Sequence, residues 1–240
     1  MNLISNEFYH IYNRGNNKKR IFFSDANYLF FLKKIRDQLS PVCKILSYCL
    51  MPNHFHFIIM ATEKSITERS SFGGKPMQEF PYRIGILLSS YSQAINKQNK
   101  TTGSIFQQKT KSKILAERIG EQQENYLVNC FHYLHRNPLN ANLVKELSQW
   151  HYSSYLDYAE LRNGTLCDKE LFFSLTGLTA CDVISGGQND FDDNYIENSI
   201  RIIGQVAFSA PTALINPQIE TIVQIASSTT NGMKSINTAA

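Results

Sequence analysis

Residues 51–60, MPNHFHFIIM, form an apolar and β-prone run that carries two histidines. Side chains along a β-strand alternate between its two faces, so His54 and His56 share one face, roughly 7 Å apart along the strand. Phe55 and Phe57 take the other face, where a core can cover them. Two imidazoles on one face of a strand, with a core behind them, make half of a site for a divalent cation.

A second informative stretch, YLVNCFHYLHRNP at residues 126–138, predicts a helix. Its apolar Leu127, Phe131 and Leu134 recur at spacings of four and three, which is the period of one buried helix face. Pro138 disfavours helical geometry at the residue before it. We therefore expect this helix to run over roughly 122–137 and to end just before the proline.

Two polar side chains of this helix, Tyr133 and Asn137, lie four residues apart and therefore point the same way. A phenol and an amide oxygen on one helix face, beside a histidine pair, suggest a nucleophile and a third metal ligand. Two simpler roles stay open. A tyrosine can merely pack on a helix surface, with Tyr126 as the competing residue, and an asparagine before a proline can cap a helix end.

The other segments alternate between strand and helix patterns. We predict strands at 8–13, 42–50, 54–61 and 111–115, and helices at 25–39, 82–99 and 122–137. The polar stretch 62–81 shows no period and contains Gly and Pro, so it is expected to be a loop. Residues 150–155 are expected to pack against the body. The initial strand–helix–strand–strand order is the first half of a ferredoxin-like sandwich.

The composition is that of an ordinary globular protein, with 240 residues of which 42% are hydrophobic and 18% charged. No apolar run reaches the length of a transmembrane helix, and the first 12 residues do not read as a signal peptide. Five scattered cysteines form no Cys-x-x-Cys pair, which indicates reduced thiols rather than a cysteine zinc site. These features predict a cytoplasmic protein without a membrane partner.

Charge is unevenly spread along the chain. Residues 1–180 hold 22 Lys and Arg against 14 Asp and Glu, a net +8, whereas residues 181–240 hold two against six, a net −4. A basic body suits a polyanion, because Lys and Arg neutralise phosphates and release counterions. Basic residues interleaved with amides and aromatics suit single-stranded DNA. The candidate DNA-contacting residues are Arg14, Lys18, Lys19, Arg20, Lys109, Lys111, Lys113 and Arg136; ordinary solvated charge is the open alternative.

Two histidines near Tyr133, at positions 132 and 135, are expected to face other directions. A helix turns about 100° per residue, so His132 and His135 do not share the face of Tyr133. His135 can pack or touch DNA, and Arg136 can meet a phosphate, although a solvated helix surface explains each equally well.

Four motifs in one order resemble the REP-associated tyrosine transposases, which belong to the single-tyrosine HUH transposases. They are YHIYNRG at 9–15, YCLMPNHFH at 48–56, GSIFQQK at 103–109 and YLHRNPLNANLV at 133–144, and the resemblance spans roughly residues 8–158. It implies an α+β fold, in which a ferredoxin-like antiparallel sheet is flanked by helices. It also implies DNA transposition, with a nucleoid-associated protein that acts on hairpin, REP-like DNA as a monomer or a homodimer.

The resemblance assigns roles to residues of this chain. It implies that His54, His56 and Asn137 hold Mg²⁺ or Mn²⁺, and that Tyr133 attacks a DNA phosphodiester to leave a 5′-phosphotyrosine. The run Asn140-Ala141-Asn142 departs from the family, where an Arg-Ala-Gly-like run is common. Two alternatives stay open: a domesticated hairpin-DNA-binding protein without turnover, and a metal-dependent nuclease that uses water.

We expect three parts along the chain. Residues 1–160 are predicted to form the catalytic domain, and residues 161–180 a peripheral extension. Residues 181–240, rich in Ser, Thr, Asn and Gly, are predicted to be a tail of unknown role, with a short helix followed by disorder.

Overall fold

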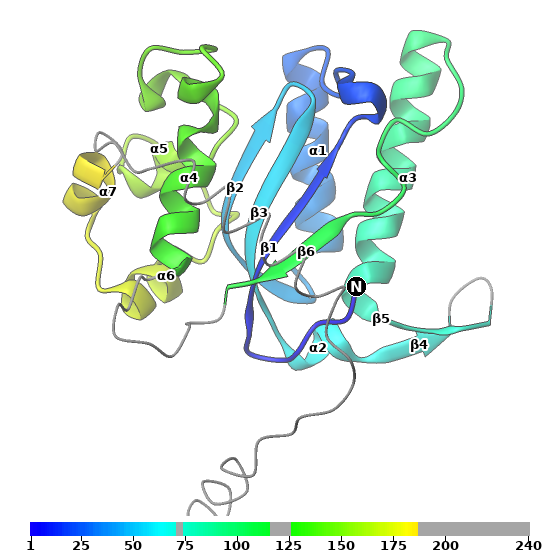
Figure 1. The fold of residues 1–240 in the computed structure, drawn as a ribbon, viewed down its shortest axis with the longest axis horizontal. Helices are drawn as coiled ribbons and strands as arrows, with labels where there is room; N and C mark the ends of the chain where they lie inside the picture. The colour runs from blue at the N-terminus through cyan, green and yellow to red at the C-terminus, as the bar shows by residue number, and fades with distance from the viewer. Residues whose placement is uncertain (71–73, 116–125, 187–240) are drawn as a thin grey trace, which may run out of the picture. The chain divides into compact units, whose positions relative to one another are not determined.

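The computed structural model of the chain describes residues 1–70, 74–115 and 126–186 (Figure 1). A four-stranded sheet in the order β2-β3-β1-β6 forms its centre, and every neighbouring pair is antiparallel. The strands are β1 (Phe8–Arg14), β2 (Cys43–Met51), β3 (His54–Ala61) and β6 (Lys111–Ile114). The predicted α+β fold with an antiparallel sheet is confirmed.

Two helices give the sheet its ferredoxin-like connectivity. Helix α1 (Asp25–Gln38) joins β1 to β2, and α3 (Glu79–Asn99) lies between β3 and β6 in the chain. Each pair of strands so connected is separated in the sheet by one other strand, which is the split βαβ arrangement. Short 3₁₀ turns, η1 (Asn16–Lys18) and η2 (Leu147–Gln149), lie in the connections.

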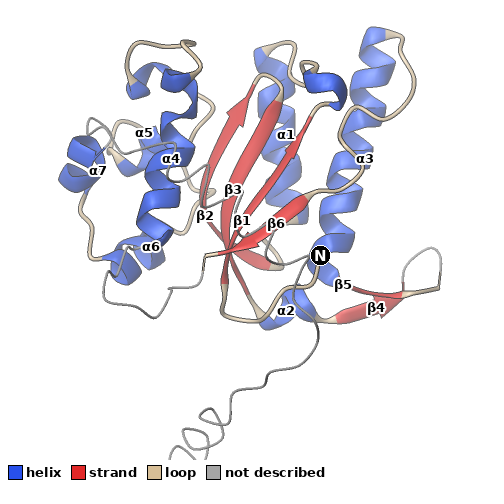
Figure 2. Cartoon of the chain, viewed as in Figure 1, coloured by secondary structure: helices blue, strands red, loops and turns tan. Residues whose placement is uncertain are grey.

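Both helices cover the same face of the sheet (Figure 2). Phe55 and Phe57 of β3 are fully buried there, as their alternation with the histidines predicts. Their rings pack with Phe31 of α1, at centroid distances of 5.4 and 6.5 Å. Tyr91 of α3 completes this aromatic core, with its ring 4.9 Å from that of Phe31. Because this core covers one face of β3, the histidines on the other face of the strand point away from α1 and α3.

Helix α4 (Tyr126–Asn140) covers the opposite face of β2 and β3, together with α5 (Tyr155–Tyr158), α6 (Lys169–Thr176) and α7 (Ala180–Gly186). Phe131 of α4 stacks on Phe172 of α6 at 4.3 Å, and both are fully buried. Strand β2 contributes to both cores because its side chains alternate between the two faces of the sheet, and a bulge between Ile45 and Ser47 shifts that alternation by one residue.

The predicted loop over 62–81 is wrong. It contains helix α2 (Glu63–Ile66), the strands β4 (Glu68–Ser70) and β5 (Pro76–Gln78), and the first turn of α3. The two strands form a short hairpin whose side chains are mostly exposed, so no apolar alternation marks it in the sequence. Arg69 ties the hairpin to α3: its guanidinium lies 3.6 Å from the Tyr82 ring centroid and 3.0 Å from a Glu79 carboxylate oxygen.

The predicted end of the tyrosine helix is also wrong, because α4 continues through Pro138 to Asn140. A proline in a helix removes one backbone N–H, here the one that would reach the carbonyl of Leu134. The side-chain amide of Asn137 supplies a replacement donor, 3.4 Å from the Leu134 carbonyl oxygen and 2.8 Å from that of Tyr133. The predicted start near 122 lies outside the described residues, as do residues 187–240 of the predicted tail.

The stretch 150–155 packs against the sheet and α1, as predicted. The indole N–H of Trp150 donates to the Leu50 carbonyl at 3.2 Å, and the Tyr152 ring stacks on Tyr28 at 3.7 Å. Asp157, 3% exposed, then anchors the turn that follows. Its carboxylate accepts from two nitrogens of Arg162, at 2.6 and 2.8 Å, and the same guanidinium donates to the carbonyl of Ser153 at 2.7 Å.

We expect Asp157→Ala to lower the free energy of unfolding by about 3 kcal/mol, at the lower end of the range for a broken buried ion pair, since Arg162 is partly exposed. Urea unfolding followed by circular dichroism measures the change. The matched control is Lys33→Ala, which breaks the solvent-exposed pair with Asp37 and should cost under about 1 kcal/mol. Equal losses in the two variants would contradict an anchoring role for Asp157.

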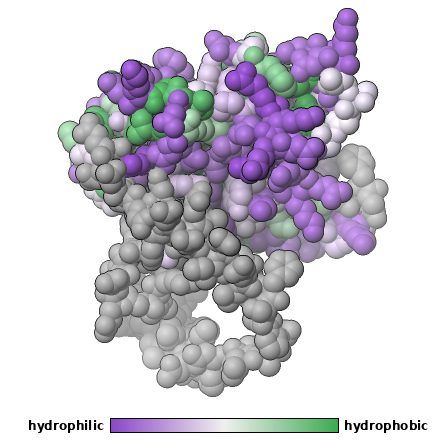
Figure 3. Space-filling model, turned by 45° about the horizontal axis from the view of Figure 1, so that its top comes forward, coloured by the Kyte–Doolittle hydropathy of each residue, from purple (hydrophilic) through white to green (hydrophobic). Residues whose placement is uncertain are grey.

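The surface carries few large apolar side chains. The face drawn in Figure 3 is mostly hydrophilic, with hydrophobic side chains in smaller groups. Among the helices of the described part, none has the length and hydropathy needed to cross a membrane. All five cysteines are free thiols, in line with the sequence prediction.

Candidate active site

The histidine pair lies on the face of the sheet that α4 covers. The rings of His54 and His56 are 4.9 Å apart, edge to face. On the neighbouring strand β1, Arg14 stands opposite His54 and Tyr12 stands opposite His56. Because directly paired residues share a face of the sheet, alternate side chains of β1 line the same site.

Helix α4 brings the tyrosine and the asparagine to these histidines. The Tyr133 ring centroid lies 6.1 Å from that of His56 and 6.4 Å from that of His10, in each case edge to face. The side chain of Asn137 lies near His54 and opposes the lowering of the His54 pKa by burial. The structure therefore brings together the four residues that the sequence singles out for the chemistry. Tyr126 lies two helical turns earlier, roughly 10 Å along the helix axis.

His10 has no role predicted from the sequence, although the structure places it inside the site. His10 is 1% exposed, and its Nε2 lies 2.8 Å from Nδ1 of His56. The Tyr12 ring stacks on His10 at 4.9 Å and lies 5.9 Å from His56. The signal that would have found both residues is the period-two alternation of His10, Tyr12 and Arg14 within the first motif.

The three imidazoles are neutral at physiological pH. Burial lowers the pKa of His54 to about 4, helped by the nearby charge of Arg14 and opposed by the side chain of Asn137. Burial lowers the pKa of His10 to about 3, and the positive charge of Lys113 adds to this effect. Burial also lowers the pKa of His56 well below its usual value. A neutral imidazole keeps the lone pair that a cation requires.

The donor atoms fit a divalent cation held by two imidazoles and one amide oxygen. Nε2 of His56 is buried and has no hydrogen-bond partner in the described part of the chain. Nδ1 of His54 lies 2.6 Å from Oδ1 of Asn53, which leaves Nε2 as the ligating atom. Asn137 uses its amide N–H on the helix backbone, so its oxygen is the atom left for the site. Within the described ranges no cluster of three or more His, Cys, Asp or Glu side chains is arranged for a metal.

Three of the predicted DNA-contacting cations border this site. Lys113 pairs with His10 and Lys111 with Tyr12 in the β6–β1 ladder, so both share the histidine face. The ammonium of Lys111 lies 5.8 Å from the Tyr12 ring centroid. Arg14 lies opposite His54. The edge strand β6 and the end of β1 thus present positive charge next to Tyr133.

The other predicted cations lie elsewhere. Lys18, Lys19 and Arg20 are exposed in the turn after β1. Arg136 is only 7% exposed, so it is not the surface cation that the sequence suggested. Its charge acts on His132, whose pKa is lowered to about 4 by burial first and by Arg136 second. His135 is buried as well and packs rather than facing solvent: its Nε2 lies 2.8 Å from Oγ of Ser154.

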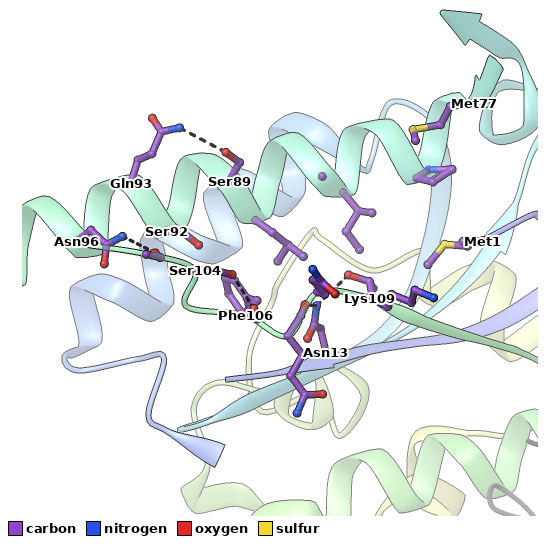
Figure 4. A pocket seen from close by; sticks show the side chains of 18 residues that line it. Met1, Asn13, Met77, Ser89, Ser92, Gln93, Asn96, Ser104, Phe106 and Lys109 are labelled. Carbon is purple, nitrogen blue, oxygen red and sulfur yellow. Dashed lines mark hydrogen bonds between the residues drawn. The ribbon is translucent and has the colours of Figure 1, made fainter. Parts of the chain in front are cut away.

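A groove of about 830 Å³ lies between α3 and the segment 103–110 that leads into β6 (Figure 4). Half of its lining residues carry amide or hydroxyl side chains, apolar side chains make up much of the rest, and Lys109 adds one cation. Asn13 closes it on the side of the sheet, where its amide donates to Oγ1 of Thr110 at 3.0 Å. Amides and hydroxyls are the groups that hydrogen-bond to exposed nucleobase edges.

No family model matches the sequence. No curated protein matches it either. One similar solved structure is that of a REP-associated tyrosine transposase bound to a REP hairpin. It is 16% identical to this chain, with a TM-score of 0.49, and the alignment covers 70% of this chain and 92% of that one.

Proposed function

We propose that this protein is a metal-dependent single-tyrosine DNA transposase of the REP-associated HUH kind. It would cleave and rejoin single-stranded DNA beside a short hairpin. The observation that carries the proposal is the meeting of Tyr133 and Asn137, one turn apart on α4, with His54 and His56 on β3.

In the proposed reaction the phenol oxygen of Tyr133 attacks the phosphorus of a phosphodiester. A bond forms between that oxygen and phosphorus, and the bond from phosphorus to the 3′-oxygen breaks. The phenol proton leaves to solvent, and the departing 3′-oxygen takes up a proton. The products are a 5′-phosphotyrosine and a free 3′-hydroxyl. Attack by a second 3′-hydroxyl reverses these bond changes and joins a new strand, so no external energy source is needed.

His54, His56 and Asn137 are the residues that would hold Mg²⁺ or Mn²⁺. A bound cation would polarise a non-bridging phosphate oxygen and hold the phosphate in line with the phenol. Two nitrogen donors favour Mn²⁺, whereas the amide oxygen suits Mg²⁺. Burial keeps the imidazoles neutral, and the packing of the Tyr133 ring against His10 and His56 restricts where the phenol can point.

The surroundings of the site support a DNA partner. Arg14, Lys111 and Lys113 provide charge for the backbone on either side of the cleaved phosphate. The groove beside α3 lies on the other side of the sheet from these cations, and its Asn13, Gln107 and Gln108 offer amides to unpaired bases. A partner of this kind would associate the protein with the nucleoid.

A covalent-trapping assay tests the proposal. Purified full-length protein is mixed with end-labelled single-stranded hairpin oligonucleotides and Mn²⁺, and the products are run on a denaturing gel. A protein–DNA band that disappears with a chelator is the expected result. Cleavage without such a band would favour a nuclease that uses water. Binding without cleavage, across a wide panel of hairpins, would favour a domesticated DNA-binding protein.

We expect Lys111→Ala to weaken hairpin binding to a similar degree for all sequences and to reduce the salt dependence. Loss of one phosphate contact lowers the slope of log K against log salt by about 0.7 to 0.9. Mobility-shift titrations at several salt concentrations measure this slope. Lys33→Ala on α1, which lies across the sheet from the site, is the control. An unchanged slope for Lys111→Ala would remove this lysine from the interface.

A further inference from the structure

His10 is a buried histidine without a role in the steps above. Its Nε2 and Nδ1 of His56 are separated by 2.8 Å, a hydrogen-bond distance between two neighbouring strands. Both rings are buried, at 1% and 6% exposure. At this distance one of the two ring nitrogens carries the hydrogen of the bond and the other accepts it.

The direction of that hydrogen bond decides whether His56 can bind a cation. A neutral imidazole carries one proton, on either Nδ1 or Nε2. If Nδ1 of His56 donates to His10, then Nε2 of His56 keeps its lone pair. If His10 donates instead, Nε2 of His56 carries the proton and cannot be a ligand. Nε2 is the buried nitrogen of His56 that has no protein partner in the described part of the chain.

We propose that His10 is a positioning residue that accepts the Nδ1 proton of His56 and so holds it in the metal-binding tautomer and orientation. The inference rests on the metal site of the proposed function. A metal-ligating histidine usually donates its second ring N–H to a carboxylate or a backbone carbonyl. Here an uncharged imidazole takes that place, so no negative charge is added to the ligand set.

The packing around His10 supports an orienting role. Its ring centroid lies 4.9 Å from that of Tyr12 and 5.0 Å from that of His56, and those two lie 5.9 Å apart, so the three rings pack in a triangle. Tyr133 meets it edge-on at 6.4 Å. In either direction of the bond one buried N–H of the pair, on Nδ1 of His10 or on Nε2 of His56, has no acceptor among the described residues. A buried N–H without an acceptor is costly, and such groups are kept mainly where function requires them.

Two substitutions separate orientation from mere packing. His10→Leu keeps an apolar body but removes the acceptor, whereas in His10→Gln the side-chain oxygen reaches a place similar to imidazole Nε2 and can accept. Phe57→Leu is the matched control, because it opens the core on the opposite face of β3 and leaves the imidazoles untouched. It reports the effect of general destabilisation alone.

The test measures Mn²⁺ affinity of the full chain by titration with electron paramagnetic resonance of free Mn²⁺, with the melting temperature of the metal-free protein recorded for each variant. We expect His10→Leu to bind Mn²⁺ about 10 to 100 times more weakly than wild type. His10→Gln should restore most of the affinity, and Phe57→Leu should melt earlier but bind normally.

Unchanged affinity in His10→Leu would overturn the inference and leave the proposed function standing. An equal loss of affinity in Phe57→Leu would overturn it too, since destabilisation would then explain the effect. A wild-type protein that binds no Mn²⁺ would overturn the metal site itself, and the role of His10 with it.

Discussion

Tyr133→Phe should abolish the covalent protein–DNA product and lower strand cleavage by more than about a thousandfold, because the substitution removes the attacking oxygen itself. The phenyl ring keeps the edge contacts with His10 and His56. The fold and the histidine face should therefore persist. Denaturing gels with labelled hairpin oligonucleotides and Mn²⁺ measure both the adduct and the cleaved strand.

Tyr126→Phe is the matched control on the same helix and should retain full activity. Mobility shifts with the hairpin should be unchanged in both variants, since neither removes a cation. An adduct of normal yield in Tyr133→Phe would move the nucleophile to another residue. Normal cleavage without any adduct, in wild type and Tyr133→Phe alike, would instead indicate hydrolysis by water.

The second large effect is expected for His54→Ala, which should lower cleavage at least about a hundredfold. A cation supplies several kcal/mol of charge stabilisation to a phosphoryl transition state, and each 1.4 kcal/mol is about a factor of ten in rate. Hairpin binding should survive, because Arg14 and Lys111 remain. Single-turnover cleavage at saturating protein, over a range of Mn²⁺ concentrations, measures the loss.

His151→Ala controls for the loss of a histidine as such, since His151 is exposed and its side chain lies outside the histidine face. If the defect of His54→Ala reflects weaker metal binding, higher Mn²⁺ should recover part of the rate. A wild-type rate in His54→Ala that also resists chelators would rule out the metal-assisted mechanism.

The central part of the fold follows from local patterns that each segment carries by itself. Strand alternation places His54 and His56 on one face and Phe55 and Phe57 on the other, and the burial of the two phenylalanines agrees. Helical periodicity places Tyr133 and Asn137 together. These relations hold between residues a few positions apart, where backbone geometry alone fixes the direction of a side chain.

Two other local features of the fold have no recognisable pattern in the sequence. The β4–β5 hairpin is held by backbone pairing and by the contacts of Arg69, so its exposed side chains need no pattern. Helix α4 continues through Pro138 because the Asn137 side chain replaces the missing backbone donor. The general tendency of proline to end a helix does not include this compensation.

Local sequence patterns therefore predict the four strands of the main sheet, the helices α1, α3 and α4, the histidine face and the pairing of Tyr133 with Asn137. Tertiary packing is needed to place α4 over that face and to bring His10 of β1 into contact with His56. It also decided that Lys111 and Lys113 border the site, while Arg136 is buried. The physical reason is that these contacts join segments far apart in the chain. Strand register and the packing of two separate cores set them, and periodicity within one segment does not encode either.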